Sequence, residues 1–326
     1  MNRSARSLVL INCLWLFGGW ALGVQSFVQA APIERANEPK ATAVDSLLLD
    51  QYPESYAAYS LRKLRSDYDG PAVRVRRSSD GAEQDIGFTS EGWVDTTEIS
   101  NFVGGGDGYV TAWYAQVEGT PDLTQSDNSN QPRIATGGTV ETDGAGKPTV
   151  FFDGHYLEAS GFGSSIPLDD YTMWGVLDPE AVDNTNVFGI GTLNNKHWET
   201  ASYRFFDSYV HHNDVRVGDG SEMSFGERNL VIIRNTGNNG DVADLWAGNA
   251  KQDETTEDGS GGTKTAVSVG GGFAGRIGEV AFYPSVPGSK VLDFYRNVNF
   301  RLGGWPCGVA RAGNYAPRCG VARHAL

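Results

Sequence analysis

Short runs of apolar residues recur along most of this chain, and turn residues separate them. Residues 72–77 (AVRVRR) alternate valine with arginine, as expected of a strand with one buried face. Comparable runs, bounded by glycine, proline, asparagine and aspartate, continue as far as residue 283. They lie at 109–114, 149–152, 171–177, 187–191, 202–206, 230–234, 244–248, 266–269 and 276–283. Because no helices are regularly interleaved with these runs, the pattern predicts an all-β fold, an antiparallel two-sheet β-sandwich.

Three other stretches have the spacing of short helices. Residues 45–66 carry a rough apolar stripe with Asp45 as a candidate cap, although Pro53 interrupts it. Residues 95–103 and 289–302 have the same character, and the apolar side chains of 289–302 are placed to lie on a sheet edge. We therefore predict short peripheral helices around the sandwich.

The first thirty residues have the pattern of an export signal. Arg3 and Arg6 precede the apolar stretch Leu8–Phe27, and Val28-Gln29-Ala30 offers small residues where a signal peptidase cleaves. Glycines and glutamines break up the stretch, so we expect cleavage after Ala30, with an uncleaved membrane anchor as the alternative. The chain is therefore expected to be secreted, extracellular or on a virion surface.

The remainder divides by composition. Residues 31–44 are polar and carry prolines, as a linker does, and residues 45–302 hold the predicted sandwich. Residues 303–326 form a glycine-rich tail that contains Cys307 and Cys319. Because an exported protein meets an oxidising compartment, we expect a disulfide between these two cysteines.

The charge balance narrows the class of partner. The formal net charge is −14, which repels phosphate backbones, so nucleic acid is not an expected partner. A membrane is expected as a partner only if residues 1–30 stay attached. The expected partners are carbohydrate or a protein of a cell surface or virion.

Several blocks of the chain resemble known β-sandwiches. Residues 57–92 (AAYSLRKLRSDYDGPAVRVRRSSDGAEQDIGFTSEG) resemble the opening of the catalytic sandwich of family 54 α-L-arabinofuranosidases, and related modules of bacteriophage virion and bacterial surface proteins. The resemblance continues through residues 109–125, 131–134 and 146–157. Residues 270–302 resemble the last strands and closing helix of laminin-G-like and concanavalin A-like sandwiches. The resemblance implies a concanavalin A-like jelly roll.

The same resemblance implies where a hydrolytic site would lie. A glycoside hydrolase of this type needs a pair of carboxylates that flank the scissile bond. The family carries one on a middle strand and one after a GGD turn, but here the late turn, Val269 to Phe273, has no acid. Asp207 and Glu279 are the remaining candidates, and the alternation around Glu279 is typical of a solvated strand face. We therefore expect no catalysis.

Metal binding has weak support in the sequence. Asn238 and Asp241 could supply oxygen ligands to calcium from a polar loop, but no spacing matches a dedicated calcium loop, and no cofactor is expected. We place His211 and His212 in a polar loop as well. Neighbouring residues on a strand would point to opposite faces and could not readily share one metal ion.

Sugar sites on sandwiches combine aromatic platforms with polar groups, because sugar rings present C–H faces and hydroxyls. Trp198 is the first candidate for such a contact, since we expect it in a polar loop beside Asn195 and His197. Trp246 is the second.

Other aromatic and basic residues have a structural explanation. Trp113 and Trp174 lie within apolar runs and are expected in the core. Arg74, Arg76 and Arg77 could contact a ligand, but we expect them on an exposed strand face, paired with neighbouring acids.

Three functions follow from these observations. The first is a non-catalytic surface or virion module that serves structure and adhesion and binds glycans. The second is a glycoside hydrolase that acts on arabinose-containing polysaccharide. The third is a purely structural assembly subunit without a small ligand.

Overall fold

The computed structural model places the described helices and strands within the unit formed by residues 41–326. It describes residues 46–168, 170–180, 186–194, 197–198, 203–206, 210–212, 215–217, 228–236, 243–247, 250–255 and 263–286, with Val291 and Asn297. Between residues 193 and 262, side chains are described only for residues 228–236.

The secondary structure is dominated by strands. The helices are α1 (Leu48–Gln51) and α2 (Thr96–Val103), with a 3₁₀ turn at Asn128–Asn130. The strands are β1 (Ala57–Ser60), β2 (Val73–Arg77), β3 (Glu83–Ile86), β4 (Gly108–Trp113), β5 (Leu123–Thr124), β6 (Arg133–Thr136), β7 (Thr139–Val140), β8 (Val150–Asp153), β9 (Tyr156–Ser160), β10 (Ile166–Pro167), β11 (Asp170–Pro179), β12 (Asn186–Ile190), β13 (Leu193–Asn194), β14 (His197–Trp198), β15 (Tyr203–Phe206), β16 (Val210–His212), β17 (Val215–Val217), β18 (Asn229–Thr236), β19 (Ala243–Ala247), β20 (Ala250–Thr255), β21 (Thr263–Lys264), β22 (Ala266–Gly270) and β23 (Ala274–Tyr283).

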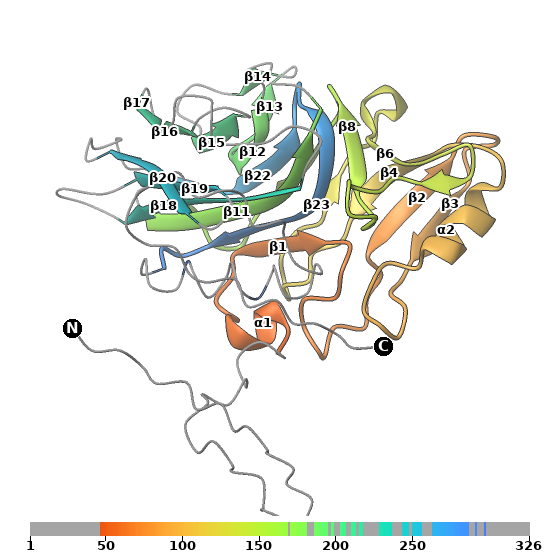
Figure 1. Ribbon diagram of the computed structural model, residues 1–326, viewed down its shortest axis with the longest axis horizontal. Helices are drawn as coiled ribbons and strands as arrows, with labels where there is room; N and C mark the ends of the chain where they lie inside the picture. Colours follow the sequence, from red (N-terminus) through yellow and green to blue (C-terminus); the bar gives the residue numbers. More distant parts are fainter. Residues whose placement is uncertain are drawn as a thin grey trace, which may run out of the picture. The chain divides into compact units, whose positions relative to one another are not determined.

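The strands pair antiparallel in two main sheets. One, which we name the β11 sheet, runs β20–β19–β18–β11–β23–β1. The other, the β22 sheet, runs β3–β2–β4–β5–β9–β22–β12–β15–β16–β17. Strands β6 and β8 connect the two sheets along one side, because β6 pairs with β4 and β8 pairs with β23 (Figure 1). The predicted antiparallel sandwich is confirmed.

Strand β11 is buried on both faces. Tyr171 and Met173 face the core between the sheets, where Trp113 of β4 is also buried. Trp174 faces the other side, where it packs in a second apolar cluster with Leu230. A continuous apolar run is typical of a strand covered on both sides, and this explains why residues 171–177 do not alternate.

The second cluster lies on the outer face of the β11 sheet. Leu48 and Leu49 of α1 belong to it, together with Leu64 and Val291. Figure 1 shows α1 directly beside β1. α1, Leu64 and Val291 therefore cover part of the outer face of this sheet.

The predicted helix at 45–66 is wrong beyond its first turn. α1 ends at Gln51, two residues before Pro53, whose ring and missing N–H disfavour helix continuation. Residues 57–60 form β1 instead, because their backbone pairs with β23. The helix begins after Leu47, which makes no side-chain cap.

The structure agrees with the other two predicted helices at the residues that it describes. α2 begins after Asp95, whose carboxylate accepts a hydrogen bond from the Glu98 backbone N–H, and its apolar residues Ile99 and Val103 are buried. Val291 and Asn297, the described residues of the predicted closing helix, are both helical. Within the described part of the chain, no helix is long and apolar enough to cross a membrane.

Candidate functional site

Glu279, a candidate for catalysis, is a buried partner in an ion pair. It lies on β23 and is 2% exposed. The Arg62 guanidinium donates to both of its carboxylate oxygens, from Nε at 2.6 Å and from Nη2 at 2.7 Å. The Ser60 hydroxyl donates a third hydrogen bond at 2.7 Å. The predicted solvated face is therefore wrong: Glu279 does point outward from the sheet, but residues 60–64 cover that face.

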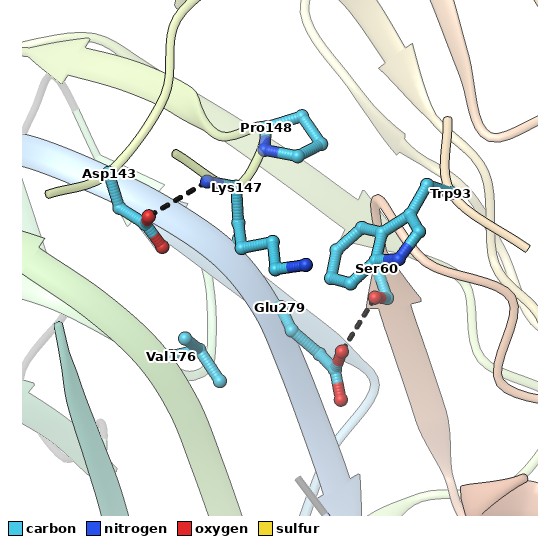
Figure 2. A pocket seen from close by; sticks show the side chains of 8 residues that line it. Ser60, Trp93, Asp143, Lys147, Pro148, Val176 and Glu279 are labelled. Carbon is cyan, nitrogen blue, oxygen red and sulfur yellow. Dashed lines mark hydrogen bonds between the residues drawn. The ribbon is translucent and has the colours of Figure 1, made fainter. Parts of the chain in front are cut away.

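A small cavity lies next to this carboxylate (Figure 2). It is lined by Ser60, Trp93, Asp143, Lys147, Pro148, Val176, Gly278 and Glu279. Figure 2 shows the Lys147 side chain reaching toward the Trp93 ring, whose centroid is 4.6 Å from the ammonium nitrogen. The volume of about 10 Å³ accommodates roughly one water molecule, so this cavity cannot hold a sugar ring.

The second acid of the cavity, Asp143, also forms an ion pair with a buried arginine. Arg228 donates to its two carboxylate oxygens at 2.6 and 2.9 Å, and both side chains are buried. The backbone N–H groups of Ala145 and Lys147 donate to it as well. Glu279 and Asp143 are therefore each neutralised by a buried arginine.

Asp178 is the neighbouring acid on β11 and is less well compensated. Burial raises its pKa above the usual aspartate value, and the nearby Asp143 and Glu180 raise it further. The Gly144 backbone N–H, at 3.2 Å from its carboxylate, and the charge of Arg276 act in the opposite direction. Since its folded pKa is raised, the stability that this group contributes is fully present below the unfolded pKa and is lost as pH rises through the folded pKa.

Replacing Asp178 by asparagine is therefore expected to raise the free energy of unfolding at pH 7, because no buried charge remains. The gain should shrink as the pH falls toward the unfolded aspartate pKa of about 3.9. Urea unfolding of the two proteins at pH 7 and pH 4 measures both effects. The matched control is Asp69→Asn, whose carboxylate is 97% exposed and which should change little. A loss of stability at pH 7 in Asp178→Asn would contradict the inference that the charged Asp178 carboxylate destabilises the folded chain.

A second feature lies on the outer surface where β2, β4, β6, β8 and β23 follow one another. Five side chains stand directly opposite one another in register on these strands. They are Arg76, Tyr109, Arg133, Phe151 and Arg276, which we name the arginine row. Cationic and aromatic residues thus alternate across five neighbouring strands.

The members of the arginine row stack on one another. The Arg76 guanidinium lies 5.0 Å from the centroid of the Tyr109 ring. The Phe151 ring receives two guanidiniums, that of Arg133 at 4.6 Å and that of Arg276 at 5.0 Å. Such stacks fix the planes of the guanidiniums while their edges remain able to donate hydrogen bonds.

The arginines of the row differ in their acidic partners. Arg133 pairs with Glu141 at 2.8 Å, and Arg276 pairs with Glu180 at 2.7 Å and with Glu141 at 3.6 Å. Arg76 donates from Nε to the neutral amide oxygen of Gln131 at 2.6 Å.

Beside the row, Arg74 forms a bidentate ion pair with Asp85, which also accepts a hydrogen bond from the Tyr114 hydroxyl at 2.6 Å. The Arg74 guanidinium lowers the pKa of Asp85, whereas burial and the Asp85 hydrogen bond raise that of Tyr114. Arg77 pairs with Asp80. The expected pairing with acids is confirmed for Arg74 and Arg77, whereas Arg76 pairs with an amide.

Most of the other site residues predicted from the sequence fall outside the described residues. They are Asp207, Asn195, Asn238, Asp241, Cys307 and Cys319. His197 and Trp198 form β14 and Trp246 lies on β19, but their side chains are outside the described part. The loop expected around Trp198 is wrong at His197 and Trp198 themselves, which form a strand that pairs with β13.

The expected polar loop at His211 and His212 is wrong, because both residues lie on β16 and pair with β17. Their backbone hydrogen bonds hold them in an extended strand. Among the residues that the structure describes, no group of three or more histidine, cysteine or acidic side chains is arranged to hold a metal ion.

Comparison with known proteins identifies the fold. No protein-family model matches this chain, and no curated protein matches it at a significant level. The structure of a GH54 α-L-arabinofuranosidase soaked with a cyclic sulfate inhibitor matches with a TM-score of 0.58 and 14% identity, over 81% of this chain and 66% of that chain. A mutant of a GH54 α-L-arabinofuranosidase soaked with 4-nitrophenyl α-L-arabinofuranoside matches over the same shares, with a TM-score of 0.56 and 16% identity.

An arabinofuranosidase complexed with arabinofuranosyl-α-1,2-xylobiose matches with a TM-score of 0.51 and 16% identity, over 74% of this chain and 62% of that chain. This chain has the β-sandwich fold of these enzymes. It spans slightly less than two thirds of each arabinofuranosidase chain.

Three consecutive glycines with positive φ form the turn at the end of β22 in this chain. Gly270, Gly271 and Gly272 have φ values of 88°, 104° and 122°, in the left-handed region that favours glycine. The sequence lacks an acid at this turn, and the backbone supplies a reason: each of these positions disfavours a side chain of any kind.

Proposed function

We propose that this chain is a glycan-binding β-sandwich that serves as a surface or virion adhesion module without hydrolytic activity. The observation that carries the proposal is the arginine row. It offers planar stacked groups with hydrogen-bond donors on an outer sheet surface, which suits sugar rings and hydroxyls. The fold is one in which arabinofuranosidases bind arabinose-containing ligands, which supports a sugar as the partner.

The absence of hydrolysis is supported by the two acids of the cavity. Glu279 and Asp143 are each held by an arginine, and their cavity has room for roughly one water molecule. The proposal includes export, cleavage after Ala30 and a disulfide between Cys307 and Cys319, as the sequence predicts.

A glycan array tests the binding, and an assay with 4-nitrophenyl α-L-arabinofuranoside tests the chemistry. We expect the full chain to bind at least one glycan class and to release no 4-nitrophenol above the uncatalysed rate. Release of 4-nitrophenol that is lost in Asp207→Asn would establish the hydrolase instead. Failure to bind any glycan would leave the purely structural subunit.

A further inference from the structure

We infer that the arginine row binds an acidic polysaccharide, with a uronic acid carboxylate on Arg76. This inference rests on the glycan-binding function proposed above and adds the chemical class of the sugar.

The arginines of the row differ in whether a carboxylate neutralises them. Arg133 and Arg276 form ion pairs with Glu141 and Glu180. Among the described residues, Arg76 has no ion pair: Glu83 stands opposite it on β3 but makes none with it, and its Nε donates to the Gln131 amide. The Arg76 guanidinium is therefore the cation of the row that remains available to an anionic ligand.

The Arg76 guanidinium is also held in a fixed orientation. Its Nε is fixed by Gln131, which is buried, and its central carbon lies 5.0 Å from the centroid of the Tyr109 ring. The terminal nitrogens are left to donate in parallel, the arrangement that recognises a carboxylate in a bidentate manner. Because the guanidinium is already oriented, little conformational entropy is lost when a carboxylate binds.

The guanidinium fork of Arg76 also fits the shape of a particular anion. A polyuronate presents a planar carboxylate, which such a fork recognises in a bidentate manner.

The test uses the full chain and compares polygalacturonate with the same polymer after its carboxyl groups have been reduced to alcohols. Calorimetry or affinity electrophoresis should show binding to polygalacturonate. The affinity for the reduced polymer should be lower by roughly 10-fold or more. Arg76→Gln should weaken binding to polygalacturonate by roughly 10-fold. Arg76→Lys keeps the charge but not the fork, and should fall between the two.

The matched control is Arg77→Gln on the same strand. Arg77 stacks on Phe102 outside the row, so its loss should leave binding unchanged. Thermal melting of each variant verifies that it folds, and if Arg76→Gln does not fold, the comparison of the two polymers with the unmodified chain still decides.

Equal binding to the two polymers would overturn the acidic class while leaving glycan binding intact. Binding to a sulfated polysaccharide but not to polygalacturonate would also overturn it. Failure to bind any glycan would instead refute the proposed function.

Discussion

Replacing Arg62 by alanine is expected to lower the free energy of unfolding by about 3–5 kcal/mol. The variant leaves the Glu279 carboxylate buried without the two hydrogen bonds and the positive charge that Arg62 supplies. The loss is large against a typical domain stability of about 5–15 kcal/mol. Chemical unfolding in urea measures it, provided that the linear slope is unchanged between the proteins.

Two further variants separate the loss of the ion pair from the loss of an arginine. Arg65→Ala removes an exposed arginine that pairs with the exposed Asp67, and should change stability little. The double variant Arg62→Met, Glu279→Leu removes both charges and should recover most of the stability. If Arg62→Ala were as stable as the unmodified chain, the buried ion pair would not be holding residues 60–64 against β23.

Gly270→Ala is expected to be the second most damaging change, with a loss of about 2–5 kcal/mol from left-handed backbone and overpacking together. The residue has a φ of 88°, and an added Cβ would collide with the His155 carbonyl oxygen and lie 2.7 Å from Cδ1 of Phe152. Urea unfolding measures the loss, and near-ultraviolet circular dichroism reports the packing around Phe152.

The control for this variant is Gly81→Ala. Gly81 has a φ of 74°, but an added Cβ there meets nothing within 4 Å. It should therefore cost only the backbone term, about 1–2 kcal/mol. Equal losses in the two variants would mean that the His155 carbonyl group moves away from the added Cβ. The turn after β22 could then accept side chains.

The sandwich itself was predictable because its signals are local. Alternation in residues 72–77 and the turn glycines are properties of neighbouring residues, and they led to β2, its hairpin with β3 and most of the later strands. The helix at 45–66 failed because pairing with β23, more than 200 residues away, decides the conformation of residues 57–60.

The functional features were harder to predict. They depend on the register between strands and on which segments bury the outer face of a sheet. The arginine row joins residues from five strands, and nothing in the spacing along the chain states that Arg133 stands opposite Phe151. The burial of Glu279 likewise depends on a segment that covers the outer face of its strand. Alternation shows which face of a sheet a residue points to, but not what covers that face.

Strand β23 pairs with β11 on one edge and with β1 and β8 on the other. It is also the last of the described strands to leave the ribosome, whereas β1 is the first. Ser60 and Glu279, joined by a hydrogen bond, are 219 positions apart in the chain. The β11 sheet cannot be completed before β23 has been synthesised, so β1, β8 and β11 carry unpaired edges while the residues before β23 are translated. Folding that depends on such long-range pairing is slow, and the partly folded chain is exposed to misassembly and to chaperones until β23 arrives.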